Sequence, residues 1–249
     1  MSFKKKRVCV ITGSRAEYGL LKRLISLLHN DNSFQLQLLV TGSHLEKNYG
    51  YTIKEIEKDN YHIDAKIKIH GKDLENYPSI VSKGINEISA EIFKLKPDLI
   101  LLLGDRYEIF AAAVGAFFLQ VPIAHIHGGE TTLGSMDEIM RHVITKMSHI
   151  HFVAAEDYRK RVIQLGEDPS NVFNVGGLGV DVIKEINFLN KSEIENKLGF
   201  KFKETNFLVT VHPETYKKEL SARLIGNLIS SLNSFENTLT IFTLPNSDL

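Results

Sequence analysis

The sequence predicts an α/β protein built on a mostly parallel, doubly wound sheet. Short apolar runs typical of buried strands alternate with segments whose apolar residues repeat at helical spacing. Parallel strands need crossover helices, so this alternation favours βαβ units. Polar residues also cluster directly after several strand runs. We therefore expect ligand chemistry at the carboxyl ends of the strands, where loops and helix N-termini converge.

Composition points to a small-molecule partner. The chain has 249 residues, enough for one large domain or for one domain and part of another, and its 30 basic residues balance 30 acidic ones. This balance gives no overall attraction to nucleic acid or to anionic membranes. The single cysteine, Cys9, has no internal disulfide partner, which fits a cytoplasmic location. The longest apolar stretch, residues 109–119, is too short for a membrane span.

Strand and helix patterns alternate through the first two thirds of the chain. Helices are expected after Ser14, whose pairing with Glu17 suggests a capping box, and after Ser135, and Pro97 ends a third helix. Strands are predicted at residues 7–12, 34–41, 62–69, 99–103, 121–126 and 149–155. The helices between them are predicted from Ser14 and at residues 51–58, 78–95, 135–147 and 156–165, with a further apolar helix between the strands at 99–103 and 121–126.

We expect a first domain over residues 1–177 and a connecting helix and linker over 178–205, with a capping box at Ser192 and Glu195. A second αβ unit starts at 206 and runs to 249. Two strands and one helix cannot cover both faces of a sheet. The unit therefore either packs on the first domain or belongs to a longer protein, and we favour the second interpretation.

The stretch from residue 98 to residue 142 contains two buried strands, each followed by polar side chains. Asp105, Glu130 and Asp137 fall at these strand ends and at the next helix start, so we expect them around a single cleft. Carboxylates in different environments can divide acid and base roles. Arg106 and Arg141 are candidate neighbours, whereas Glu108 is expected on a solvated helix face.

Two other motifs leave alternatives open. His125 and His127 would share one face of a strand, and with Glu130 they suggest a metal-dependent hydrolase as an alternative function, although no cysteine completes a ligand set. The turn from Gly13 to Gly19 opens a helix, where Arg15 either helps to bind a phosphate or is simply solvated. The sequence lacks GxGxxG and P-loop motifs at this turn.

Eight motifs occur in one order along almost the whole chain: GSRAEYGLL, TGSHL, LGDRYE, HIHGGE, DEIMRH, GEDPSNVFNVGG, VTVHPE and LPNSD. In this order they resemble the hydrolysing UDP-N-acetylglucosamine 2-epimerases of bacterial sialic-acid and legionaminic-acid biosynthesis and of the animal bifunctional enzyme. Non-hydrolysing relatives carry GTRPE at the first turn and EAG after the fifth strand. The SRAEY and HGGE motifs of this chain place it on the hydrolysing side.

The resemblance implies a glycosyltransferase-B-like pair of Rossmann-like domains, without a metal or nicotinamide cofactor, and a homodimer. The implied reaction is elimination of UDP followed by addition of water, which gives a free manno-configured sugar. It implies an acid/base and water-handling set, a set of UDP contacts, and a place near the sugar for His44. The acid/base residues are Asp105, Glu130 and Asp137, with His212 also expected to be catalytic. The UDP contacts are Arg15, Gly19, Arg106, His212 and Asn246, and Arg141 is also expected to bind the substrate.

One feature departs from the resemblance. The family continues beyond the LPNSD motif into the rest of its second domain, which includes a glycine- and serine-rich loop and a glutamate that hold the diphosphate and the ribose. This loop and this glutamate are absent from the 249 residues. A non-catalytic nucleotide-sugar-binding protein is therefore a further alternative.

Overall fold

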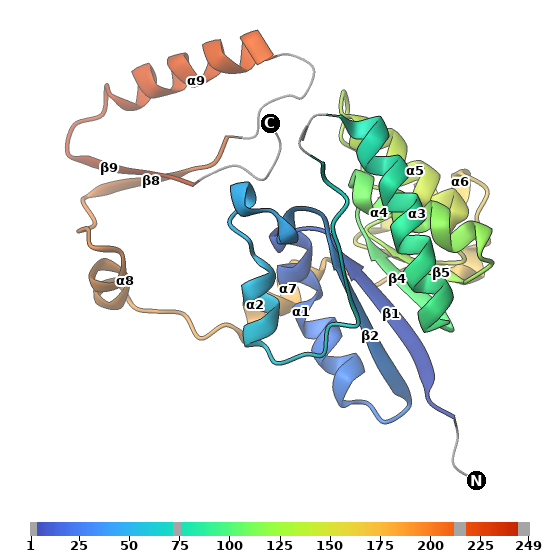
Figure 1. The fold of residues 1–249 in the computed structure, drawn as a ribbon. Coiled ribbons are helices and arrows are strands. Elements are labelled where there is room, and N and C mark those ends of the chain that lie inside the picture. Colours follow the sequence, from blue (N-terminus) through green and yellow to red (C-terminus); the bar gives the residue numbers. More distant parts are fainter. Residues whose placement is uncertain (1–3, 72–75, 212–217, 244–249) are drawn as a thin grey trace. The chain divides into compact units, whose positions relative to one another are not determined.

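The computed structural model describes residues 4–71, 76–211 and 218–243 (Figure 1). The chain divides into two compact units, Met1–Lys184 and Glu185–Leu249, and each is described by itself.

The first unit is built on a seven-stranded sheet in which all neighbouring strands are parallel. Its order is β3-β2-β1-β4-β5-β6-β7, which is the order of a Rossmann-like sheet extended by one strand. The order reverses between β1 and β4, and such a switch point is where ligands bind in open α/β sheets. The strands are β1 (Lys6–Thr12), β2 (Phe34–Thr41), β3 (Ala65–Ile67), β4 (Leu99–Leu103), β5 (Ile123–Ile126), β6 (Ile150–Val153) and β7 (Val172–Asn174).

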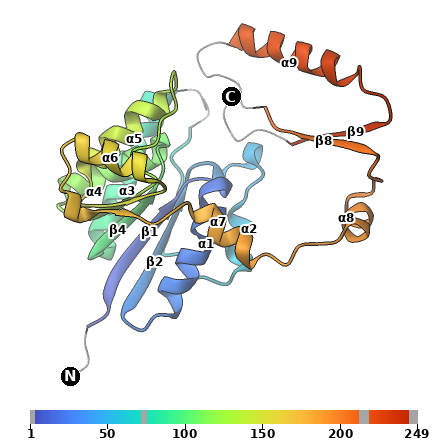
Figure 2. The ribbon, with the colours of Figure 1, turned by 180° about the vertical axis from the view of Figure 1, so that it is seen from behind.

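Helices cover both faces of this sheet (Figures 1 and 2). Alternate residues of β1 point to opposite faces: Val10 packs with α1 and α2, whereas Cys9 and Ile11 pack with α3, α4 and α5. This two-sided burial confirms the predicted doubly wound α/β fold. The helices are α1 (Arg15–Asn30), α2 (Ile53–Lys58), α3 (Tyr77–Leu95), α4 (Tyr107–Phe118), α5 (Met136–Met147), α6 (Glu156–Gln164) and α7 (Leu178–Glu185).

The predicted helix starts at Ser14 and Ser135 are confirmed, because each serine side chain caps its helix by accepting a backbone N–H bond. Three predicted strand lengths are wrong. The strand expected at residues 149–155 covers only Ile150–Val153. The strand expected at residues 62–69 pairs with β2 only over Ala65–Ile67, because β3 is an edge strand with one neighbour. The strand at 121–126 is shorter as well, and begins at Ile123 after Pro122, which lacks a backbone donor.

The second unit contains α8 (Lys191–Leu198), β8 (Thr205–Val209), α9 (Lys218–Leu232) and β9 (Thr238–Phe242). β8 and β9 pair in parallel, with Phe207 beside Thr240, so the unit is one βαβ crossover. The capping box predicted at Ser192 is wrong. Asn190 caps α8, and its partner is Glu193, because Glu195 instead accepts bonds from Lys201 and from the Phe202 backbone.

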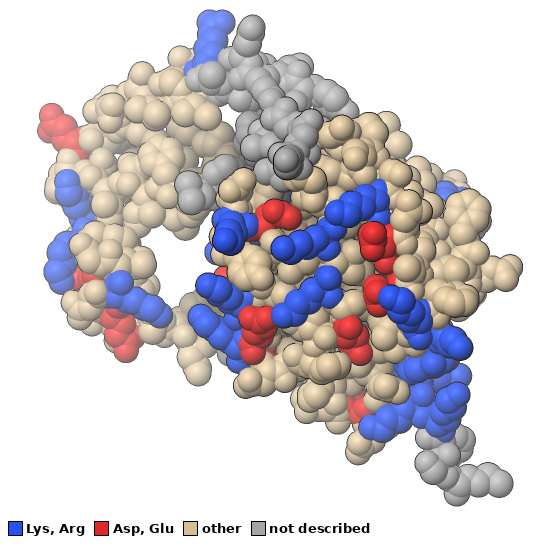
Figure 3. All heavy atoms as spheres, in the orientation of Figure 1, with Lys and Arg blue, Asp and Glu red and all other residues tan. Residues whose placement is uncertain are grey.

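The surface agrees with the balanced composition. Acidic and basic side chains are interspersed over the face of the first unit shown in Figure 3, and basic ones gather beside the N-terminus. Within the three described segments, no helix is long and apolar enough to cross a membrane.

Candidate active site at the carboxyl ends of the strands

Asp105 and Arg141 form an ion pair that joins two elements of the predicted site. Asp105 follows β4, and Arg141 on α5 donates from Nη2 to its carboxylate. Arg141 also lies 3.3 Å from the Thr132 hydroxyl, which fixes the direction of its guanidinium. Burial raises the pKa of Asp105 to about 6, although the charge of Arg141 acts in the opposite direction. Asp105 can therefore exchange a proton in the neutral range.

Asp137 lies in the first turn of α5, where the Ser135 hydroxyl is 3.2 Å from its Oδ2. Burial raises the pKa of Asp105, and the negative charge of Asp137 raises it further. Such an effect requires the two carboxylates to be close. The structure thus brings together two of the three predicted carboxylates.

Glu130, the third carboxylate, is held by a histidine. His127 Nδ1 lies 2.7 Å from Glu130 Oε1, and both side chains are partly exposed. Burial acts to raise the pKa of Glu130, but the bond from His127 and the charge of Arg141 outweigh it, so this pKa is lowered. Glu130 and Asp105 therefore have pKa values moved in opposite directions, as expected for groups that divide base and acid roles.

His125 is a buried residue that holds two elements of the site together. Its ring is fully buried on β5, with Nε2 2.8 Å from the Gly104 carbonyl and Nδ1 3.1 Å from the Thr145 hydroxyl. Burial lowers its pKa to about 4, so the ring is neutral. Because a carbonyl only accepts, Nε2 carries the proton. His125 thus ties the loop after β4 to α5.

The arrangement does not support the metal alternative. β5 ends at Ile126, and His127 has a left-handed φ of +64°, so its ring does not lie on the same strand face as that of His125. Both nitrogens of His125 already have partners in Gly104 and Thr145. Among the described residues, no group of three histidine, cysteine or carboxylate side chains is arranged to hold a metal ion.

The two glycines of the HGGE motif are required by packing. A Cβ atom on Gly128 would lie 3.1 Å from His125 Nδ1. Gly129 has a φ of +79°, and a Cβ there would lie 2.5 Å from the Tyr158 carbonyl oxygen. Small residues at both positions therefore let the loop turn closely over β5 and present Glu130.

A second charged cluster lies at the switch point between β1 and β4. Arg106 Nε is 2.8 Å from Glu108 Oε1 and 3.9 Å from Glu17 Oε1. The prediction of a solvated Glu108 is wrong, because its side chain is fully buried. Helical spacing could not reveal this, since the first turn of α4 faces the loop after β1. The one signal in the sequence was a glycine at position 13, because a residue without a side chain leaves room for a buried neighbour.

The remaining predicted contacts lie around α1 and beneath it. Arg15 begins α1 and is exposed, and Gly19 is exposed on the same helix with open space at its missing Cβ. His44 is fully buried, with its ring nitrogens 3.2 Å from the Thr12 hydroxyl and 2.8 Å from that of Thr52. Its side chain therefore supports the loop and has no surface open to a sugar. His212 and Asn246 lie outside the described residues.

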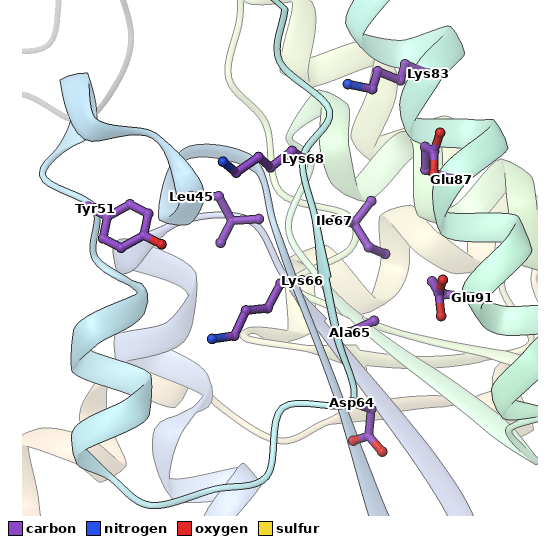
Figure 4. Close-up of a pocket in the computed structure, with 10 residues that line it drawn as sticks. All are labelled: Leu45, Tyr51, Asp64, Ala65, Lys66, Ile67, Lys68, Lys83, Glu87 and Glu91. Atoms are coloured by element: carbon purple, nitrogen blue, oxygen red, sulfur yellow. The ribbon is translucent and has the colours of Figure 1, made fainter.

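A hollow also lies away from the predicted site. A cavity of about 580 Å³ runs along the outer edge of β3, opposite Lys83, Glu87 and Glu91 of α3 (Figure 4). Its lining includes Lys66 and Lys68 and none of the residues predicted for the active site. Lysines along an edge strand block pairing with other strands, which accounts for their presence without a ligand.

Comparison with known proteins identifies the family. The model of the UDP-N-acetylglucosamine 2-epimerase family matches residues 26–249. The chain belongs to this family. It is 39% identical over 246 residues to a protein of Campylobacter jejuni named GDP/UDP-N,N'-diacetylbacillosamine 2-epimerase (hydrolyzing), covering 98% of this chain and 64% of that protein. It is 41% identical over 235 residues to polysialic acid biosynthesis protein P7 of Escherichia coli, covering 94% of this chain and 60% of that protein.

Solved structures of family members share the fold. The crystal structure of UDP-GlcNAc 2-epimerase from Neisseria meningitidis bound to UDP-GlcNAc superposes with a TM-score of 0.81 at 20% identity, over 96% of this chain and 66% of that one. The fold is therefore glycosyltransferase-B-like, as predicted. The chain spans less than two thirds of the length of the two curated relatives.

Proposed function

We propose that the protein acts as a hydrolysing UDP-N-acetylglucosamine 2-epimerase, which converts a UDP-sugar to the free manno-configured sugar and UDP. One observation carries this proposal: Asp105, paired with Arg141 and close to Asp137, lies at the end of β4, next to the strand β5 that leads into Glu130. The family and the name of the Campylobacter jejuni relative support the same reaction class.

The reaction needs three proton transfers: a proton leaves carbon 2, a proton returns to carbon 2, and the attacking water gives a proton to a base. Elimination breaks the bond from carbon 2 to hydrogen and the bond from carbon 1 to the UDP oxygen, and leaves a double bond in a 2-acetamidoglycal. Addition of water then places a hydroxyl on carbon 1 and a proton on carbon 2. A base must be ionised and an acid must hold a proton near neutral pH. We assign the base role to Glu130 and the proton-exchanging role to Asp105, because their pKa values move in opposite directions.

Binding of the UDP diphosphate is assigned to arginines near α1. Arg15 opens this helix, whose free N–H groups and dipole favour an anion, and the planar guanidinium of Arg106 suits phosphate oxygens. Gly19 leaves open space on the exposed surface of the same helix. His212 and Asn246 stay predicted contacts on the nucleotide.

Two substrates should be compared: UDP-N-acetylglucosamine and the UDP-diacetamido-trideoxyglucose implied by the diacetylbacillosamine relative. The assay follows UDP release and the configuration of the sugar by ¹H NMR. We expect UDP and a manno-configured product from one of them. UDP binding without turnover of either substrate would instead support the non-catalytic alternative, and absence of both would contradict the proposal.

A matched pair of variants tests the site. Asp105→Asn removes the proton-exchanging group and should lower kcat by about 100-fold or more. Asp157→Asn removes a carboxylate from an exposed pair with Lys160 on α6 and should leave kcat unchanged. Equal activity of the two variants would contradict the assignment of Asp105.

We also propose a homodimer. Large apolar side chains are exposed on neighbouring helices, among them Phe93 on α3, Phe117 and Phe118 on α4, and Ile139 on α5. Exposed apolar area of this kind is typical of a surface between copies of a chain. Phe118→Ser should therefore lower the mass measured by light scattering, whereas Leu27→Ser on the opposite face of the sheet should not. A monomeric wild-type protein would contradict the proposal.

A further inference from the structure

The cluster of Glu17, Arg106 and Glu108 combines one cation with two buried carboxylates. Arg106 Nε lies 2.8 Å from Glu108 Oε1, and its distance to Glu17 Oε1 is 3.9 Å. Glu108 is completely buried and Glu17 is 7% exposed. Neither carboxylate belongs to the acid/base set proposed above, so their burial at the ligand-facing end of the sheet needs an explanation of its own.

The cluster joins the ends of three adjacent strands. Gly13 follows β1, and a Cβ atom on it would lie 2.2 Å from Glu108 Cγ. Gly42 follows β2 with a φ of +59°, and its Cβ would lie 2.9 Å from Glu108 Oε1. Ser43 Oγ and the His44 N–H both donate to the Gly13 carbonyl. Glycine at positions 13 and 42 therefore leaves room for the Glu108 side chain beneath the two loops. From there Glu108 contacts Arg106, which follows β4.

The two carboxylates are not equivalent. Glu108 makes the short, charge-assisted contact with Arg106. Glu17 accepts the Gly13 N–H at 2.7 Å through Oε2, and its Oε1 lies 3.9 Å from Arg106 Nε. Among the described residues, Glu17 Oε1 and Glu108 Oε2 are both buried without a hydrogen-bond partner. Two ionised carboxylates beside one guanidinium would leave an uncompensated buried negative charge, which is costly. A proton on one carboxylate removes that charge. Glu17 has the longer contact with Arg106, so protonation of Glu17 costs less attraction to the guanidinium than protonation of Glu108.

We propose that Glu17 and Glu108 are positioning residues for Arg106, with Glu108 in the short contact and Glu17 held as a neutral acid. A proton on Glu17 lowers the negative charge beside the guanidinium, while both side chains keep it in place. This inference deepens the proposed function, and its ligand-binding consequence rests on that function. If Arg106 contacts a nucleoside diphosphate, a neutral Glu17 preserves the attraction between them.

The electrostatic surroundings agree with this arrangement. Burial and the neighbouring charge of Glu108 raise the pKa of Glu17, against the opposing effect of Arg106 and of the backbone N–H bonds. Arg106 and Glu108 are the charged side chains that act on Glu17, and His70 and Tyr107 in turn face Glu108. A proton is therefore retained on Glu17 at a pH where an exposed glutamate has lost it.

The direct test needs no ligand. The side-chain carboxyl carbons of glutamate are labelled with ¹³C in the full chain, and their chemical shifts are followed from pH 5 to pH 9, with Glu17 assigned from the spectrum of Glu17→Gln. We expect the Glu17 shift of a neutral acid at pH 6.5. An ionised Glu17 at that pH would overturn the inference even if the protein binds UDP. A neutral Glu17 in a protein that fails to bind UDP would support it and count against the proposed function instead.

A binding experiment tests the consequence. Between pH 7 and pH 9 ionisation of Glu17 should weaken UDP binding by about tenfold in the wild type, in addition to any change that comes from titration of UDP itself. Glu17→Gln cannot ionise at this position, so its UDP affinity should show only the change that comes from UDP. Glu156→Gln, which removes a carboxylate from a surface pair with Arg159, should show the wild-type pH dependence. The same pH dependence in Glu17→Gln and in the wild type would overturn the inference.

Discussion

The Nδ1 nitrogen of His127 lies 2.7 Å from Oε1 of Glu130. The histidine reaches this position in a left-handed backbone conformation, with φ of +64°, while its N–H donates to the Phe152 carbonyl on the neighbouring strand. A non-glycine residue in the left-handed conformation is strained, so the surrounding structure must hold His127 there. The bond orients Glu130 and favours its ionised form.

His127→Ala should therefore make activity more sensitive to acid. Without the bond from His127 the pKa of Glu130 rises, so the ionised base is lost at a higher pH as the solution is acidified. The acid limb of the kcat profile should move up by about one pH unit. His142→Ala removes a similar contact, 3.2 Å from Glu138 on α5, and should leave the profile in place. An unchanged acid limb in His127→Ala would contradict the role of this bond.

The raised pKa of Asp105 predicts a change of stability with pH. Its folded-state pKa of about 6 lies above the ordinary value near 3.9, so the folded protein holds this proton more tightly than the unfolded chain does. The resulting stabilisation is complete below about pH 4 and is lost as the pH rises through 6. The wild type minus Asp105→Asn difference in unfolding free energy should be about 2 kcal/mol larger at pH 4 than at pH 7.

Urea unfolding at the two pH values measures this difference. Asp157→Asn is the control, because this aspartate is exposed and its removal should give the same difference at both pH values. A wild type minus Asp105→Asn difference that grows from pH 4 to pH 7 would mean that the ion pair with Arg141 outweighs burial.

Two glycines of the first turn should respond oppositely to alanine. Gly13→Ala places a methyl group against buried Glu108 and should destabilise the protein by about 1 to 3 kcal/mol. Gly19→Ala meets no atom within 4 Å on α1 and should stabilise it by about 0.5 to 1 kcal/mol. Thermal unfolding compares them, and a Gly13→Ala protein as stable as the wild type would contradict the close approach of Glu108.

Gly19→Ala also separates folding from binding. If Gly19 contacts UDP as predicted, the added methyl group should weaken UDP binding in a protein that is more stable than the wild type. Isothermal titration measures the affinity. Wild-type affinity in this variant would remove Gly19 from the UDP contacts.

Strand ends are easier to predict from the sequence than the contacts between them. Period and apolar runs locate β4 and β5 and thus the polar groups that follow, and Asp105 and Arg141 do meet. Which way a loop turns depends on neighbours far away in the sequence. Glu108 appeared solvated because its side chain packs against Gly13, in the loop after β1, which precedes it by almost a hundred residues.

The same limit explains the histidines. The His-x-His spacing would present both rings on one face if the strand continued, but β5 ends between them at Ile126. His125 then packs beneath the loop and His127 turns to Glu130. Strand ends depend on pairing with neighbouring strands, and no local pattern in the sequence records that pairing.

The central claim, that Asp105, Glu130 and Asp137 carry proton transfer at carbon 2 of a UDP-sugar, is tested most directly in deuterated water. The UDP-sugar turned over by the protein is incubated in D₂O, and the free sugar is analysed by ¹H NMR and mass spectrometry. We predict a manno-configured product with deuterium at carbon 2, formed together with UDP and at least about 100-fold more slowly by Asp105→Asn, Glu130→Gln and Asp137→Asn. A gluco-configured product that keeps hydrogen at carbon 2 would show simple hydrolysis and contradict the claim.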